Sequence, residues 1–228
     1  MTPKEQNIPK YWSPEGLAVP VDWLIFDLDN TLYPASSRLA DEMHQRMTGF
    51  VAERLGISHE QALAIRQAGF ARHGTTLRWL QLEAGLESPE PFLDYVHPSN
   101  LGDFLSPRPE LRGLLDGLAL PKAILTNAPR SHALRVLQYF GVADCFDQIF
   151  DLQWNRYEGK PHQGAYERCL SALGVAANRA VFIDDIPEYL ATFHALGGNC
   201  ILVDESGRKT DTPYPAVPSV LDLPQIIH

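Results

Sequence analysis

Apolar residues recur at helical spacing in the part of the chain that follows its first apolar run. Between positions 39 and 55 they lie three or four residues apart, and Gly56 then provides a helix stop. Ser58 followed by Gln61 is typical of a capping box, so a second helix is expected there. Its apolar residues are Leu63, Ile65 and Phe70, and a third helical stretch follows with Leu77, Trp79, Leu80 and Leu82. Residues 35–105 are therefore predicted to form an all-helical insertion.

From residue 107 onwards, short apolar runs alternate with helical segments. The runs lie at 122–125, 148–152, 180–183 and 200–203, and the helical segments lie at 109–118, 130–140, 162–173 and 187–196. This alternation is typical of a parallel sheet with helices on both faces. We therefore predict an α/β fold, in which residues 21–34 and 106–228 form a doubly wound, Rossmann-like core and residues 35–105 form an inserted helical cap. A polar extension is expected at 1–20, and a Pro-rich tail at 210–224 is expected to wrap the surface.

Composition narrows the class of protein. The chain has 228 residues, of which 45% are hydrophobic and 21% charged, so it can bury a full core. A formal charge of -9 argues against a nucleic-acid partner, although a single nucleotide remains admissible. Because no run of 18 apolar residues and no signal-peptide core occur, we expect no membrane span and a cytoplasmic location. No segment argues for a particular assembly, so a monomer or a homodimer is expected.

The scattered cysteines and histidines predict no metal or redox site of their own. The three cysteines have no C-x-x-C spacing and suit a reducing compartment, and no pair of the eight histidines has the spacing of metal ligands. We therefore assign no histidine to a metal.

The first apolar run, residues 21–26, ends in two carboxylates separated by one residue, Asp27 and Asp29. Residues i and i+2 of a strand point to the same side, so both acids can face one pocket at the carboxyl end of the sheet. One carboxylate could then attack an electrophile or bind a cation, while the other, with its proton affinity raised by its neighbour, serves as general acid and base. The alternative is an Asx-rich turn that merely closes the strand.

Three later segments favour the catalytic interpretation. Thr126 and Asn127 follow an apolar run and precede a helix, Lys160 lies in a loop before Pro161, and Asp184 and Asp185 follow another apolar run. Adjacent acids after a buried strand repel each other and are costly to desolvate. A divalent cation is the simplest compensation for this repulsion.

This set of motifs, in this order, resembles the haloacid dehalogenase superfamily of phosphohydrolases over roughly residues 21–203. Within that superfamily, the segments at 29–34, 73–77 and 126–128 resemble the pyrimidine 5'-nucleotidase branch. The resemblance implies that Asp27 takes the phosphoryl group as an aspartyl phosphate, and that Asp29 protonates the leaving group and then activates water. It also implies a Mg²⁺ ion bound by Asp27, the backbone carbonyl of Asp29 and the pair Asp184 and Asp185. The phosphoryl oxygens would be held by Thr126, Asn127 and Lys160.

The chain departs from the family pattern after the acidic pair. Relatives commonly carry a small hydroxyl residue and then an asparagine there, whereas this chain has Ile186 and Tyr189. The difference puts the support of the metal site in doubt but leaves its direct ligands in place.

Two further groups are candidates for recognising the rest of the substrate. His73, Thr75 and Thr76 in the inserted segment could contact it, although Thr75 or Thr76 could equally be a helix N-cap. Trp154 and Tyr157 could stack on a base, or could simply pack against the core.

We therefore expect a magnesium-dependent phosphomonoesterase that acts on a small phosphomonoester, a nucleotide such as UMP or CMP. Three alternatives remain open. A dehalogenase would use Asp27 alone, another phosphatase could act on a sugar phosphate, phosphoglycolate or flavin mononucleotide, and a binding protein could keep the fold without turnover.

Overall fold

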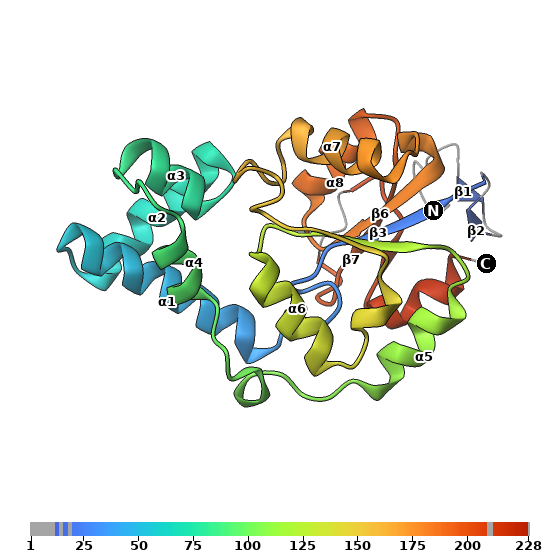
Figure 1. The fold of residues 1–228 in the computed structure, drawn as a ribbon, viewed down its shortest axis with the longest axis horizontal. Coiled ribbons are helices and arrows are strands. Elements are labelled where there is room, and N and C mark those ends of the chain that lie inside the picture. Colours follow the sequence, from blue (N-terminus) through green and yellow to red (C-terminus); the bar gives the residue numbers. More distant parts are fainter. Residues whose placement is uncertain (1–11, 14–15, 18–19, 209–211, 228) are drawn as a thin grey trace, which may run out of the picture.

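A computed structural model describes residues 12–13, 16–17, 20–208 and 212–227. A parallel sheet flanked by helices lies on one side of the molecule, and a group of helices extends from it on the other (Figure 1). Among the described residues, no helix is both long and apolar enough to cross a membrane.

The sheet has six parallel strands in the order β5-β4-β3-β6-β7-β8, of which the last, β8, is Ala216–Val217. Strand β3 (Trp23–Phe26) lies between β4 (Lys122–Leu125) and β6 (Ala180–Asp184). Strand β5 (Gln148–Phe150) pairs with β4, and β7 (Asn199–Val203) pairs with β6. Four of these strands are almost continuously buried apolar runs, as expected for a sheet covered on both faces. The predicted fold class is confirmed.

Alternate residues of each strand belong to two separate cores, one on each face of the sheet. Leu24 and Phe26 pack with helices α5 (Pro109–Gly117) and α6 (Arg130–Tyr139), whereas Ile25 packs with α7 (Gln163–Leu173) and α8 (Pro187–Ala195). Figure 1 shows these two pairs of helices on opposite sides of the strands. Short 3-10 helices at Ala143–Cys145 and Ala177–Arg179 precede β5 and β6.

Between β3 and β4, four helices precede α5. They are α1 (Arg38–Leu55), α2 (His59–His73), α3 (Thr76–Glu83) and α4 (Glu90–Val96), followed by a 3-10 helix at Leu101–Asp103. Gly56 ends α1 in the left-handed conformation at φ 64°, and Ser58 and Gln61 form the predicted capping box at the start of α2. The sequence pattern did not reveal α4. The domain boundaries at 35 and 105 remain a prediction.

Helix α2 does not bury its large apolar residues. Leu63, Ile65 and Phe70 are 36%, 41% and 44% exposed, and the buried face carries Ala62, Arg66 and Gly69 instead. The reason is close packing between α2 and α3, because a Cβ atom at Gly69 would clash with the ring of Trp79.

The C-terminal tail differs from its sequence-based expectation. The tail does not merely wrap the surface: β8 (Ala216–Val217) extends the sheet at β7, and a 3-10 helix at Val220–Gln225 follows it. Val217, Val220 and Leu223 are buried in the core, which explains this ordering. Within the predicted extension at 1–20, β1 (Trp12–Ser13) and β2 (Gly16–Leu17) form an antiparallel pair, and the remaining residues lie largely outside the described ranges.

Candidate active site

The carboxyl ends of the central strands bring three acids together. Asp27 follows β3, Asp184 ends β6 and Asp185 comes next, and each offers a carboxylate oxygen within 4.8 Å of the others. All three residues are buried. The backbone N–H of Asp27 donates to the carbonyl of Ile183 at 2.8 Å, so the pairing of β3 and β6 continues up to the acids. Several carboxylate oxygens without histidine are the donors that Mg²⁺ prefers, so this group fits that ion.

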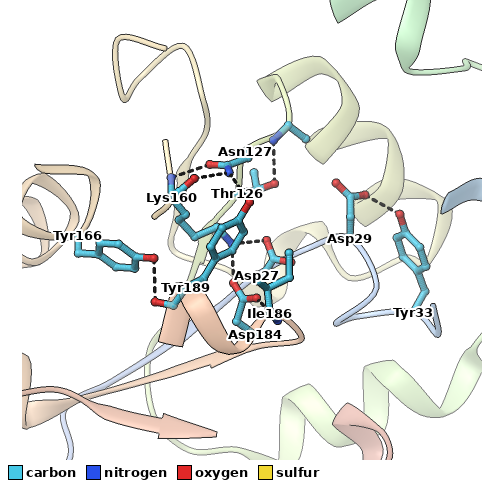
Figure 2. A network of polar contacts seen from close by, with 11 residues as sticks. Asp27, Asp29, Tyr33, Thr126, Asn127, Lys160, Tyr166, Asp184, Ile186 and Tyr189 are labelled. Carbon is cyan, nitrogen blue, oxygen red and sulfur yellow. Dashed lines mark hydrogen bonds and ion pairs between the residues drawn. The ribbon is translucent and has the colours of Figure 1, made fainter. Parts of the chain in front are cut away.

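Lys160 provides the positive charge beside these acids. Its Nζ donates to Asp27 Oδ1 and to Asp184 Oδ2, both at 2.6 Å, and Figure 2 shows the side chain between the two carboxylates. Burial raises the pKa of Asp27 well above its usual value, against the opposing effect of Lys160. Although burial alone would lower the pKa of Lys160, Asp184 and Asp27 raise it. The lysine is therefore a fixed cation at the base of the site.

The side chain of Asn127 holds the backbone of Lys160. Its Oδ1 accepts from Lys160 N–H and its Nδ2 donates to the Lys160 carbonyl, both at 2.8 Å. A Cβ atom at Gly159 would clash with this amide, so the loop requires glycine before the lysine. Thr126 is buried, and its hydroxyl accepts from the N–H of Ala128 at 3.0 Å. The predicted Thr-Asn and Lys-Pro segments thus meet beside the acids.

Asp29 has surroundings quite different from those of Asp27. Its Oδ1 accepts from the hydroxyl of Tyr33 at 2.5 Å and contacts Nε2 of His132 at 2.8 Å, and in Figure 2 it points towards Tyr33 and away from the acid cluster. Burial alone would raise its pKa, but His132 and Tyr33 lower the pKa of Asp29 to about 2. The expectation that its proton affinity is raised was therefore wrong, because these partners stabilise the ionised carboxylate.

His132 was not singled out from the sequence, although it contacts a predicted catalytic residue. It is fully buried on α6, and its ring lies 4.7 Å from that of His97, measured between centroids. Burial and the nearby His132 lower the pKa of His97 to about 3, so that ring is neutral. His97 follows α4, and its Nδ1 contacts the carbonyl of Leu93 at 2.7 Å. His97 of the inserted segment therefore contacts His132, the partner of Asp29.

The two departures from the family pattern have their own contacts. The N–H of Ile186 donates to Asp184 Oδ1 at 2.8 Å, so the backbone supports this acid. The ring of Tyr189 lies 5.0 Å from Nζ of Lys160, and its hydroxyl accepts from Asn127 Nδ2 at 3.3 Å. These contacts hold Asp184 and Lys160 in place.

A cavity of about 330 Å³ lies between the inserted helices and the sheet core. Asn127 and Tyr189 line it from the core, and Thr75 and Thr76 line it from the start of α3. Thr75 is also the N-cap of α3, where its Oγ accepts from the N–H of Arg78 at 3.0 Å. The helix-cap alternative for Thr75 is therefore observed, and a contact of Thr75 with the substrate remains a prediction.

The other candidate recognition residues lie outside the lining of this cavity. His73 Nε2 contacts Glu83 Oε1 at 2.8 Å. Trp154 packs its ring on Phe150, with centroids 4.6 Å apart, and Tyr157 donates to Glu90 at 2.9 Å. These three contacts are structural in the described form of the protein.

The model of the haloacid dehalogenase-like hydrolase family matches residues 21–197. The chain belongs to this family of hydrolases. Strand β3 with Asp27, the Lys160 loop and the acidic pair all fall inside the matched region.

Two curated relatives carry names from phosphate chemistry. Phosphate metabolism protein 8 of Saccharomyces cerevisiae is 29% identical over 175 residues, which are 70% of this chain and 54% of that protein. The chain thus spans about half the length of this relative. A phosphatase of Mycobacterium tuberculosis is 27% identical over 202 residues, covering 82% of this chain and 89% of that protein.

Among solved structures, L-2-haloacid dehalogenase from Xanthobacter autotrophicus has a TM-score of 0.58 at 19% identity, with 90% of this chain and 97% of that chain covered. At this identity the similarity shows the fold alone. The choice between dehalogenase and phosphatase must therefore come from the site.

Proposed function

We propose that this hydrolase is a magnesium-dependent phosphomonoesterase, with Asp27 as its nucleophile. The observation that carries the proposal is the buried group of Asp27, Asp184 and Asp185 around Nζ of Lys160. Phosphoryl transfer mainly requires alignment and positive charge against the non-bridging oxygens. A dehalogenase acting through Asp27 alone would have no use for this acidic group or for a second acid at Asp29.

The residues would share the reaction as follows. A carboxylate oxygen of Asp27 attacks phosphorus, the bond from phosphorus to the leaving oxygen breaks, and Asp29 gives that oxygen a proton. Asp29 then takes a proton from water, which attacks the aspartyl phosphate and releases inorganic phosphate. Because the pKa of Asp29 is about 2 in the free protein, Asp29 must gain a proton before it can donate one.

Thr126, Asn127 and Lys160 would bind the phosphoryl oxygens, with Lys160 as the charged member of the set. Asp27, Asp184, Asp185 and the backbone carbonyl of Asp29 would hold Mg²⁺. When bound, the ion would offset the charge of the phosphoryl group and of the acids.

For the substrate, we propose a pyrimidine nucleoside 5'-monophosphate, UMP or CMP. The support is the likeness of the segments at 29–34, 73–77 and 126–128 to the pyrimidine 5'-nucleotidases, together with Thr75 and Thr76 in the cavity beside Asn127. The name of the yeast relative is compatible with such a phosphatase. The inserted helices would then act as a cap that covers the substrate and excludes water.

A phosphate-release screen tests this function directly. The panel contains UMP, CMP, AMP, a hexose phosphate, phosphoglycolate and flavin mononucleotide, each assayed with magnesium and with EDTA. We expect release from UMP and CMP with magnesium and almost none with EDTA. A preference for another ester would support phosphomonoesterase activity but would contradict the proposal that the substrate is a pyrimidine nucleotide.

Chloride release from 2-chloropropionate is measured in parallel. Chloride release without phosphate release would identify a dehalogenase. If the protein releases neither chloride nor phosphate, it is a binding protein.

A further inference from the structure

Helix α2 places a charged residue on its buried face. Arg66 is 8% exposed, and it shares this face with Ala62 and Gly69, while Phe70 on the same helix is 44% exposed. Burying a guanidinium costs several kcal/mol unless a partner compensates the lost hydration, so such an inversion needs a cause.

No acid compensates the charge of Arg66 within the described part of the chain. Its Nη1 contacts the sulfur of Met47 at 3.8 Å, which is a weak acceptor, and its Nε has no hydrogen-bond partner there. Burial and the neighbouring Arg66 lower the pKa of His44, so this ring stays neutral and supplies no countercharge. Burial also lowers the pKa of Arg66 itself. Because Nε has no partner and the sulfur of Met47 is a weak acceptor, the guanidinium retains hydrogen-bond donors for a group outside the protein.

Arg66 lines the same cavity as Asn127 and Tyr189. Because Asn127 holds the backbone of Lys160, the cavity borders the proposed phosphoryl site. Six of the other lining residues are apolar: Met47, Phe70, Leu77, Phe92, Leu93 and Leu152. The lining also holds neutral polar side chains, among them Gln67, Thr75 and Thr76, and Arg66 is its guanidinium.

We propose that Arg66 determines substrate specificity by donating hydrogen bonds to an oxygen acceptor on the leaving group of the phosphoester. This inference rests on the proposed function and adds to it the chemistry of the leaving group. Two sources could supply the acceptor: the ring carbonyl that UMP and CMP share, or the carboxylate of a phosphorylated acid. Either would find a desolvated cation in an apolar cavity, where such a bond is stronger than in water.

Arg66→Met tests the role because methionine fills a similar space without donors. We measure kcat/KM on UMP, on phosphoglycolate and on phenyl phosphate, whose leaving group lacks an acceptor. A lost hydrogen bond to a charged group is worth roughly 1.5–3 kcal/mol, so kcat/KM should fall about 10- to 100-fold for the ester with the recognised acceptor. Phenyl phosphate hydrolysis should change little. Loss on UMP identifies the carbonyl, and loss on phosphoglycolate identifies the carboxylate.

The melting temperature separates recognition from a structural role. Because Arg66→Met removes a buried charge without an acidic partner, Tm should stay equal or rise. Arg66→Lys keeps the charge and should recover part of the activity. Arg72→Met is the matched control, since Arg72 lies on the same helix but is exposed and paired with Glu83. This control should leave the kcat/KM of all three esters unchanged.

Equal losses on all three esters with a lower Tm would overturn the proposal, and so would unchanged kinetics. If the wild-type protein hydrolyses none of the esters, the proposed function fails, and calorimetry with uridine and with glycolate then decides the role of Arg66. Binding that Arg66→Met weakens at least tenfold supports the inference, whereas absent or unchanged binding overturns it.

Discussion

Asp27 and Asp29 lie two positions apart, yet their surroundings push their pKa values in opposite directions. Burial raises the pKa of Asp27, while His132 and Tyr33 hold the pKa of Asp29 at about 2 despite its burial. In the free protein this order is the reverse of the proposed roles, in which Asp27 attacks as a carboxylate and Asp29 donates a proton. The protein thus controls Asp29 through two hydrogen-bonding partners outside the acid cluster.

Tyr33→Phe tests this control at the scale of one hydroxyl. The change removes the donor 2.5 Å from Asp29 Oδ1 and leaves the buried ring in place. Losing a donor destabilises the ionised carboxylate, so the pKa of Asp29 should rise. We expect the limb of the pH profile of kcat that reports Asp29 to move to higher pH, whichever protonation state is required. An unshifted profile over pH 3–9, with both proteins folded throughout, would show that Tyr33 does not tune Asp29.

Single residues were predictable where they follow a strand. Asp27, Asp184 and Lys160 could be found because each ends a strand or lies in a loop beside one, and parallel strands gather such ends at one edge. His132 could not, because it is a lone histidine inside a helix, 103 positions from Asp29 along the chain. Arg66 likewise has no motif around it. Its burial depends on how α2 packs, and apolar spacing alone does not determine that packing.

At the scale of elements, the spacing of apolar residues predicted most of the strands and helices, but it did not predict which face of α2 is buried. The predicted run at 122–125 coincides with β4, and the run at 180–183 lies within β6. In α2, however, the face that packs against α3 is determined by the small size of Gly69 and not by hydrophobicity, because the ring of Trp79 packs directly on Gly69. The two-residue strand β8 was missed because a Pro-rich segment gives no periodic signal.

Gly69→Ala tests whether α2 and α3 depend on this close approach. The added Cβ would clash with the Trp79 ring, and overpacking of this kind costs about 1–3 kcal/mol. Tm should therefore fall by roughly 2–10 °C for a chain of this size.

Gly113→Ala is the matched control for this substitution. Gly113 is an exposed residue of α5 with nothing within 4 Å of the added atom, so alanine should raise stability by about 0.5–1 kcal/mol through helix propensity. If the two variants shift Tm in the same direction, helix propensity and not the Trp79 contact dominates at Gly69.

At the scale of the whole molecule, charge is distributed in a way that favours cation binding. The chain carries a formal charge of -9, and the three acids at the sheet edge are buried around one lysine. Acids gathered in a low-dielectric interior repel each other, and each desolvated charge destabilises the fold. The core is large enough to tolerate this local cost, because both faces of the sheet are covered by apolar clusters.

Magnesium should therefore stabilise the folded protein as well as support turnover. A ligand at 100 times its Kd stabilises the folded state by about 2.7 kcal/mol, which corresponds to a rise in Tm of roughly 5–10 °C here. Differential scanning fluorimetry at constant ionic strength, with sodium chloride replacing magnesium chloride, removes the general salt effect on the acidic surface.

In Asp184→Asn, the rise in Tm caused by magnesium should be largely lost, since one of the three gathered carboxylates is gone. Asp222→Asn, which changes an acid of the C-terminal 3-10 helix outside this acidic group, should keep the full rise. If all three proteins gain the same few degrees from magnesium, the ion is acting on the surface charge, and the acidic group at the ends of β3 and β6 is not its binding site.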